Sequence, residues 1–289
     1  MNTFFCRAFQ CCFAVGARFL PWRTPEVFSG EGSLLRAADI LRENGLRRPF
    51  VVASRRQCAD AHFRALQEKL DEQDILLSIF SSVEPNPSAQ TVEKIVAQYQ
   101  LDGCDCFLVI GGGSPMDAAK AAAARLARPD KSLSQLAGLL KVRRRIPTLI
   151  AVPTTAGTGS ETTIAAVITG SDHHKCAISD LCLIPRYAIL DPALTVGLPP
   201  HITAETGIDA LTHAVEAYLS RFYNTKQTRA LAENAVMTIF THLERAYRDG
   251  TSLPDRAAML QASFDAGAAF TRASVGNVHA IAHTLGGLY

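Results

Sequence analysis

The sequence lacks several features that would define its class at once. No apolar run among its 289 residues reaches the roughly 20 residues that a membrane-spanning helix needs. The eight cysteines form no CxxC pair and no regular framework, which favours reduced thiols in a cytoplasmic protein over a disulfide-stabilised secreted one. Charged residues make up 19% of the chain and sum to only +2, with both signs interleaved, so no nucleic-acid partner is indicated.

The composition itself is that of a globular protein with a sizeable core, since 48% of the residues are hydrophobic. Residues 1–23 differ from the rest, because they hold three arginines, many aromatic residues and no acid. We expect this apolar and basic leader to be amphipathic, with weak contact to a membrane surface as an alternative.

Strand-like and helix-like segments alternate through the first two thirds of the chain. Strands are predicted at 49–54, 75–80, 106–111, 148–153, 165–169, 175–179 and 187–190, with helices at 62–73, 91–100 and 114–127 among them. This alternation predicts a parallel sheet built from βαβ crossovers. Beyond the GLPP segment at 197–200 every segment has a helical pattern, which predicts an α/β domain at 24–198 followed by an all-helical domain at 199–289.

A glycine-rich turn follows the apolar segment CFLVI at 106–110 and precedes an alanine-rich helix. Glycines let a backbone approach a phosphate closely, and the free N–H groups at a helix start bind that anion. The same pattern also occurs in an ordinary tight strand-to-helix turn, so it does not by itself establish a nucleotide site.

An acid and an imidazole lie one helical turn apart on an apolar segment, at Asp209 and His213. A second such pair, His279 and His283, follows on another apolar segment. The i, i+4 spacing puts both groups of a pair on one helix face, where they can hold a divalent metal ion. The alternative is that Asp209 only forms hydrogen bonds and His213 is a core histidine.

Four segments together resemble the iron-containing alcohol dehydrogenase family: GGGSPMDAAK (111–120), PTTAGTGSE (153–161), DALTHAVEAY (209–218) and HAIAHTLGG (279–287). The resemblance extends over roughly residues 24–289. It implies a dehydroquinate synthase-like fold, with a Rossmann-like dinucleotide-binding domain and a helical metal-binding domain, and possible assembly as a homodimer.

The resemblance also implies roles for individual residues. Asp209, His213 and His279 would hold Fe²⁺, alternatively Zn²⁺, and His283 would relay a proton or face the substrate. The cofactor, NAD or NADP, would contact Ser54, Asn86, Gly112, Gly113, Ser114, Asp117, Thr154, Thr155, Thr158 and Lys175. Family members that use NAD carry an aspartate where this chain has Ser54, and Arg55 and Arg56 follow it, which suggests that NADP is accepted.

The implied reaction is hydride transfer between a small primary alcohol or aldehyde and NAD(P). The family's fourth metal ligand, a histidine, would follow HAIAHTLGG, whereas the sequence ends at Tyr289. We therefore expect a truncated helical domain with exposed apolar faces. Two alternatives are an inactive nucleotide-binding remnant, or partner subunit of an intact paralogue, and a dehydroquinate synthase-like lyase.

Overall fold

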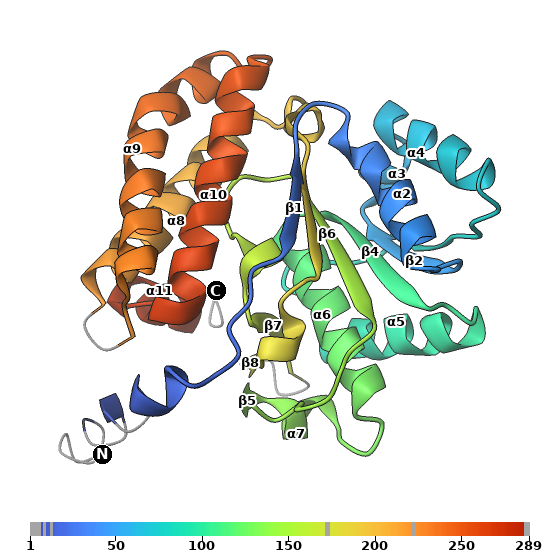
Figure 1. The fold of residues 1–289 in the computed structure, drawn as a ribbon, viewed down its shortest axis with the longest axis horizontal. Helices are drawn as coiled ribbons and strands as arrows, with labels where there is room; N and C mark the ends of the chain where they lie inside the picture. The colour runs from blue at the N-terminus through green and yellow to red at the C-terminus, as the bar shows by residue number, and fades with distance from the viewer. Residues whose placement is uncertain (1–6, 8–9, 12–13, 171–173, 221–222, 286–289) are drawn as a thin grey trace.

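The computed structural model describes residues 7, 10–11, 14–170, 174–220 and 223–285 (Figure 1). Six parallel strands form the main sheet in the order β1-β9-β6-β4-β2-β3. The strands are β1 (Glu26–Ser29), β2 (Pro49–Ala53), β3 (Ser78–Phe80), β4 (Cys106–Gly111), β6 (Thr148–Pro153) and β9 (Tyr187–Leu190). The sequence of β4 is a continuous apolar run because both faces of the sheet are covered.

Alternate residues of each central strand enter two different cores. Phe107 and Val109 of β4 pack with α5 (Ala89–Leu101) and α6 (Gly113–Ala127), and the ring of Phe107 stacks on Tyr99 with centroids 4.7 Å apart. Leu108 and Ile110 pack on the other side, with α2 (Arg36–Glu43) and α4 (Ala61–Asp71). The predicted Rossmann-like three-layer arrangement is confirmed.

Some elements differ from the sequence prediction. The strand expected at 75–80 is shorter, because only Ser78–Phe80 pairs with β2, while Ile75 turns fully into the core. The strand expected at 49–54 stops at Ala53, since Ser54 caps the short helix α3 (Arg55–Cys58) with a capping box. The helix α7 (Leu133–Leu136) and the two-residue strand β5 (Gly138–Leu139) were not predicted.

A second sheet of three strands contains β5, β8 (Lys175–Ser179) and β7 (Ala165–Thr169), with β7 and β8 antiparallel. The described residues of the α/β region also contain four short 3₁₀ helices: η1 (Ser33–Leu35), η2 (Ser160–Thr162), η3 (Leu181–Leu183) and η4 (Pro192–Thr195).

After β9 the described residues contain no further strand, and the chain forms four helices beside the sheet (Figure 1). These are α8 (Pro200–Leu219), α9 (Lys226–Arg248), α10 (Leu253–Ala273) and the shorter α11 (Asn277–Leu285). The first three pack closely through small side chains, and one of their clusters consists of Ala214, Ala217, Ala232, Ala235, Ala266, Ala269 and Ala273. Among the described residues, no helix is long and apolar enough to cross a membrane.

Only part of the predicted leader is described. Its Trp22 indole N–H donates to the carbonyl oxygen of Ala17 over 2.7 Å, and the guanidinium of Arg272 lies over the Trp22 ring, 5.5 Å from the centroid. The end of the leader therefore packs against the last turn of α10. Residues 1–6, 8–9 and 12–13 lie outside the described residues.

Candidate metal and cofactor site

Helices α8 and α11 bring Asp209, His213 and His279 together, with one ligand atom from each lying within 4.8 Å of the others. An oxygen of Asp209 lies 3.4 Å from Nε2 of His279, and the other oxygen lies 3.9 Å from Nδ1 of His213. Both histidines are buried, whereas the Asp209 side chain is 37% exposed. The third residue, His279, lies more than sixty positions after His213 in the chain, so the cluster depends on tertiary packing.

The His213 ring is held between two other rings. It stacks on His279 and on Phe270 of α10, each with centroids 4.1 Å apart and an interplanar angle of 14°. On the face of α8 that points away from solvent, Ala210, Ala214 and Ala217 are fully buried. This packing fixes the helix against α9 and α10. The His213 ring and the helix that carries it are therefore positioned by packing before any metal binds.

The pKa values of the two imidazoles are shifted in opposite directions. Burial lowers the pKa of His213 to about 4, with the Asp209 carboxylate opposing the shift. Hydrogen bonding to Asp209, and then to Glu216, raises the pKa of His279 although burial opposes it. At neutral pH His213 is therefore an uncharged imidazole, the form that binds metals.

These residues fit a divalent metal ion. Nδ1 of His213 is buried and has no hydrogen-bond partner among the described residues, which is costly for a polar atom unless a further group binds there. One carboxylate with two imidazoles is a donor set that suits iron, zinc or manganese. His283 lies in α11, but its side chain is outside the described residues, so its expected role is not addressed.

The glycine turn after β4 lies directly against the PTTAGTGSE segment. A Cβ atom on Gly112 would lie 3.1 Å from Oγ1 of Thr155, and one on Gly113 would lie 3.0 Å from Cγ2 of Thr158. Gly112 caps α6, so Gly113 and Ser114 form the first turn of that helix, where unpaired N–H groups are available. The two segments expected to contact the cofactor thus form one continuous surface.

The same threonine-rich loop also contacts the helical region. A Cβ atom on Gly157 would lie 2.7 Å from Cβ of Thr206 in α8, and one on Gly159 would lie 2.6 Å from Cα of Gly267 in α10. The backbone of Gly157 also lies near enough to the His213 ring to raise its pKa slightly against the effect of burial. One loop therefore lies against both the glycine turn after β4 and a potential metal ligand.

A buried lysine anchors the threonine-rich loop through hydrogen bonds to its backbone. The Lys120 ammonium is fully buried and donates to the carbonyl oxygens of Ser160 and Thr163 at 2.5 and 2.9 Å. Burial lowers its pKa to about 8, and Asp117, one turn earlier, opposes that shift. Asp117 accepts a hydrogen bond from the Ser160 hydroxyl at 3.2 Å and is influenced by the charge of Lys175.

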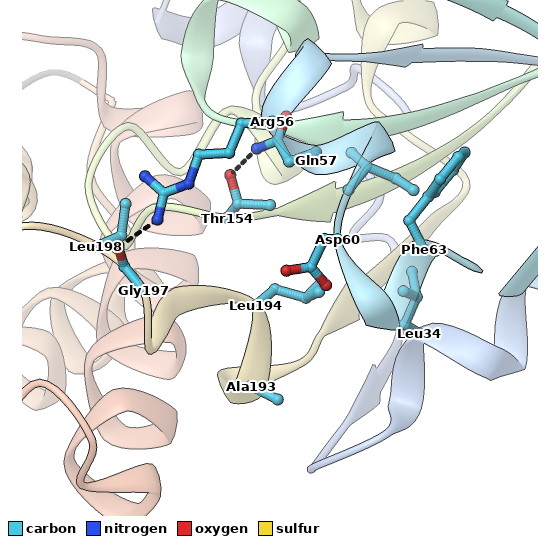
Figure 2. Close-up of a pocket in the computed structure, with 11 residues that line it drawn as sticks. Leu34, Arg56, Gln57, Asp60, Phe63, Thr154, Ala193, Leu194, Gly197 and Leu198 are labelled. Atoms are coloured by element: carbon cyan, nitrogen blue, oxygen red, sulfur yellow. Dashed lines mark hydrogen bonds between the residues drawn. The ribbon is translucent and has the colours of Figure 1, made fainter. Parts of the chain in front are cut away.

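A cavity of about 100 Å³ lies beside the loop, between α3 and the segment after η4 (Figure 2). Gln57 donates to the Thr154 hydroxyl at 2.7 Å, and Arg56 donates to the Gly197 carbonyl at 2.5 Å across the cavity edge. The Ser54 hydroxyl does not line this cavity, because it accepts a hydrogen bond from the Gln57 backbone. Asn86 lies on an exposed loop with a left-handed backbone, φ 55°.

No role was predicted from the sequence for three residues of this site: Gln57, Lys120 and Glu216. Lys120 and Glu216 both fall inside the quoted motifs, at the end of GGGSPMDAAK and within DALTHAVEAY. A charged residue within an otherwise apolar helical segment was the available signal, since such a residue needs a buried partner.

Comparisons with known proteins agree with this geometry. The family model for iron-containing alcohol dehydrogenase matches residues 24–192, and the model for the C-terminal part of the Fe-containing alcohol dehydrogenase family matches residues 203–289. A probable alcohol dehydrogenase of Escherichia coli, EutG, is 39% identical over 263 residues, covering 91% of this chain and 66% of the relative.

Solved structures give the same result. The 1,3-propanediol oxidoreductase structure superposes with a TM-score of 0.89 at 36% identity, over 94% of this chain and 71% of that one. Sulfoacetaldehyde reductase from Bifidobacterium kashiwanohense, solved in complex with NAD⁺, has a TM-score of 0.82 at 31% identity, over 92% and 71% of the two chains. The chain spans 61–69% of the length of the curated relatives first matched. On the family models, these relatives and the fold together, the chain belongs to the iron-containing alcohol dehydrogenase family.

Proposed function

We propose that the protein is a metal-dependent alcohol dehydrogenase that transfers a hydride between a small primary alcohol or aldehyde and NAD(P). The observation that carries this proposal is the contact of the threonine-rich loop with both sites, through Thr155 and Thr158 at the phosphate-binding turn and Gly157 at His213. Such a loop would bring a bound dinucleotide and a bound metal ion to neighbouring positions. The oxidoreductase names of the relatives support the same reaction class.

The residues divide the work between two regions. Asp209, His213 and His279 would hold Fe²⁺, alternatively Zn²⁺, while the α6 N-terminus and its glycines would bind the cofactor phosphates. When bound, the metal supplies Lewis acidity toward the alcohol oxygen, and the nicotinamide supplies the hydride acceptor. The buried imidazole of His213 keeps a lone pair available at neutral pH. His283 remains our proposal for a proton-relay or substrate-facing group.

Ten residues would contact the cofactor, from both faces of the threonine-rich loop and from the segments around it: Ser54, Asn86, Gly112, Gly113, Ser114, Asp117, Thr154, Thr155, Thr158 and Lys175. We also propose that NADP is accepted. The exposed guanidiniums of Arg55 and Arg56 support this, although Arg56 already binds the Gly197 carbonyl. Equal affinities for NAD and NADP, unchanged in Arg55→Ala and Arg56→Ala, would refute that part.

We further propose a cytoplasmic homodimer, with weak membrane contact of the leader as a secondary possibility. In the described part of the chain no cysteine is in a disulfide, which is consistent with a reducing compartment. The exposed apolar side chains of α8, α9 and α11 favour one alternative, a partner subunit or remnant without activity of its own. Nothing in the site favours the lyase alternative.

The test combines metal analysis with turnover. The purified protein is supplied anaerobically with Fe²⁺ or Zn²⁺, and oxidation of NADH or NADPH by propanal is followed. We expect one metal per chain, and a loss of both metal and turnover in His213→Ala. The control is His242→Ala, whose ring pairs with Asp255 away from the cluster, at 2.7 Å. Metal-free, inactive wild-type protein would overturn the proposal in favour of the inactive alternative.

A further inference from the structure

One carboxylate links α8 to α11 within the metal site. Glu216 is 8% exposed and accepts three hydrogen bonds: from the backbone N–H of Gly276 at 2.8 Å, from that of Val278 at 2.7 Å, and from Nδ1 of His279 at 2.5 Å. Two of its donors belong to the start of α11, where helix N–H groups lack partners within the helix. Glu216 therefore acts as a cap for α11 while it binds the ring of a potential metal ligand.

Within the part of the chain that the structure describes, few apolar contacts hold α11 on the rest of the molecule. Among the α11 side chains that the structure describes, only His279 is buried, and Val278 and Ile281 are 56% and 61% exposed. The helix therefore gains little hydrophobic stabilisation from its own side chains. Its position, and with it that of His279, depends on the polar contacts with α8.

The Glu216 contact also bears on which ring nitrogen of His279 carries the proton. A neutral imidazole carries one proton, and a carboxylate accepting from Nδ1 keeps that proton on Nδ1. Nε2 lies 3.4 Å from Asp209, whose hydrogen bond to the ring raises the pKa of His279. A metal ion at Nε2 would replace that contact, while Glu216 keeps the proton on Nδ1. With the proton on Nε2 instead, that nitrogen could not bind a metal.

We propose that Glu216 is a positioning residue, which anchors α11 and holds His279 in the Nδ1–H tautomer with Nε2 directed at the metal position. This rests on the proposed function only in taking Asp209, His213 and His279 as the metal ligands. Partners of this kind that orient a ligating histidine typically change metal affinity by about 10–100-fold when they are removed.

Two variants separate the charge from the shape of the side chain. Glu216→Ala removes all three acceptor contacts. Glu216→Gln keeps the shape, but its NH₂ group must face at least one of the three N–H donors, because both carboxylate oxygens are in use. The control is Glu205→Gln, an exposed acid on the same helix.

Metal affinity is the first readout, measured by competition for Zn²⁺ with a chromogenic chelator. We expect affinity to fall about 10–100-fold in Glu216→Ala, less in Glu216→Gln, and not at all in Glu205→Gln. Circular dichroism shows whether α8, α9 and α10 remain folded. Unchanged Zn²⁺ affinity in both Glu216 variants would overturn the proposal.

The second readout does not need a metal. Ring ¹⁵N chemical shifts of His279 are recorded in the metal-free protein at alkaline pH, where the ring is neutral. We expect the Nδ1–H tautomer in the wild type and a shift toward Nε2–H in Glu216→Ala. The same tautomer in both proteins would contradict the inference. A wild type that binds no Zn²⁺ but has the Nδ1–H tautomer would contradict the proposed function and support the positioning role.

Discussion

The α/β region and the helical region bury their side chains in different ways. In the first, large side chains such as Phe50, Phe63 and Phe107 are fully buried on the two faces of the six-stranded sheet. In the second, the contacts between α8, α9 and α10 are made largely by alanine. Since hydrophobic stabilisation scales with the apolar area removed from water, the sheet gains more of it per buried residue.

The helical region also exposes more large apolar side chains than the α/β region does. Large exposed apolar residues of the helical region form stripes along α8, α9 and α11: Ile208, Val215, Tyr218, Leu219, Met237, Phe240, Tyr247, Val278, Ile281 and Leu285. In the described part of the α/β region from Glu26 onward they are fewer and scattered: Val27, Leu76, Leu101 and Leu139. The α/β region thus leaves little apolar area in water, whereas the helical region leaves more of it exposed.

The largest expected effect is in the sheet core. Phe107→Ala removes a fully buried ring that packs against Tyr99 and Phe50, and should lower the free energy of unfolding by about 3–5 kcal/mol. Ala269→Gly, at a fully buried position in α10, should cost about 1 kcal/mol. Urea unfolding of both variants measures the contrast. Equal losses would mean that the two cores are not energetically different.

The next effect concerns the loop between the regions and depends on pH. Burial raises the pKa of Glu161 from 4.5 to about 7, with the Lys120 charge opposing the shift. Because its folded pKa exceeds its unfolded pKa, its stabilising contribution is complete below pH 4.5 and is lost as the pH rises through 7.

Wild-type protein should therefore lose up to about 3 kcal/mol of unfolding free energy through this group between pH 5 and pH 8. Glu161→Gln, which cannot ionise, should lack that loss. Urea unfolding at the two pH values gives the comparison, with Glu205→Gln as the exposed control. Parallel pH dependences in wild type and Glu161→Gln would show that Glu161 is not the cause.

The smallest effect on stability is expected on the exposed stripes. Phe240→Ser and Ile281→Ser replace side chains that are 74% and 61% exposed, so the free energy of unfolding should change by no more than about 0.5 kcal/mol. Binding of a hydrophobic fluorescent dye and self-association in light scattering should both decrease. Leu101→Ser, at an isolated position 86% exposed, serves as the control. Equal dye binding by all three variants would remove the distinction between stripe and scattered residue.

Much of the fold could be predicted from the sequence because its signals are local. The apolar runs of β2, β4 and β6 identify buried parallel strands, and the absence of such runs after residue 200 identifies the helical region. The short edge strand β3 was overextended in the prediction, because Ile75 and Leu77 are as apolar as a strand residue while they pack below the sheet. Apolar character alone does not distinguish a strand residue from a residue outside the strand whose side chain packs into the core.

The candidate site could be predicted only in part, for the same reason. Asp209 and His213 are adjacent on one helix, so their spacing indicates a shared face. The bonds of Lys120 to Ser160 and of Glu216 to Gly276 join residues 40 and 60 positions apart, and no local pattern predicts such pairs. The exposed apolar faces expected for the helical region are present on α8, α9 and α11.

The threonine-rich loop has a thermodynamic consequence. It contacts the glycine turn after β4 through Thr155 and Thr158, and lies against His213 through Gly157. Under the proposed function, ordering of the loop by a ligand at one place would therefore change the free energy of binding at the other. Such coupling is reciprocal: the factor by which a dinucleotide changes the affinity for a metal equals the factor by which the metal changes the affinity for the dinucleotide. Neither affinity is then a property of its own residues alone, and each has meaning only when the concentration of the other ligand is stated.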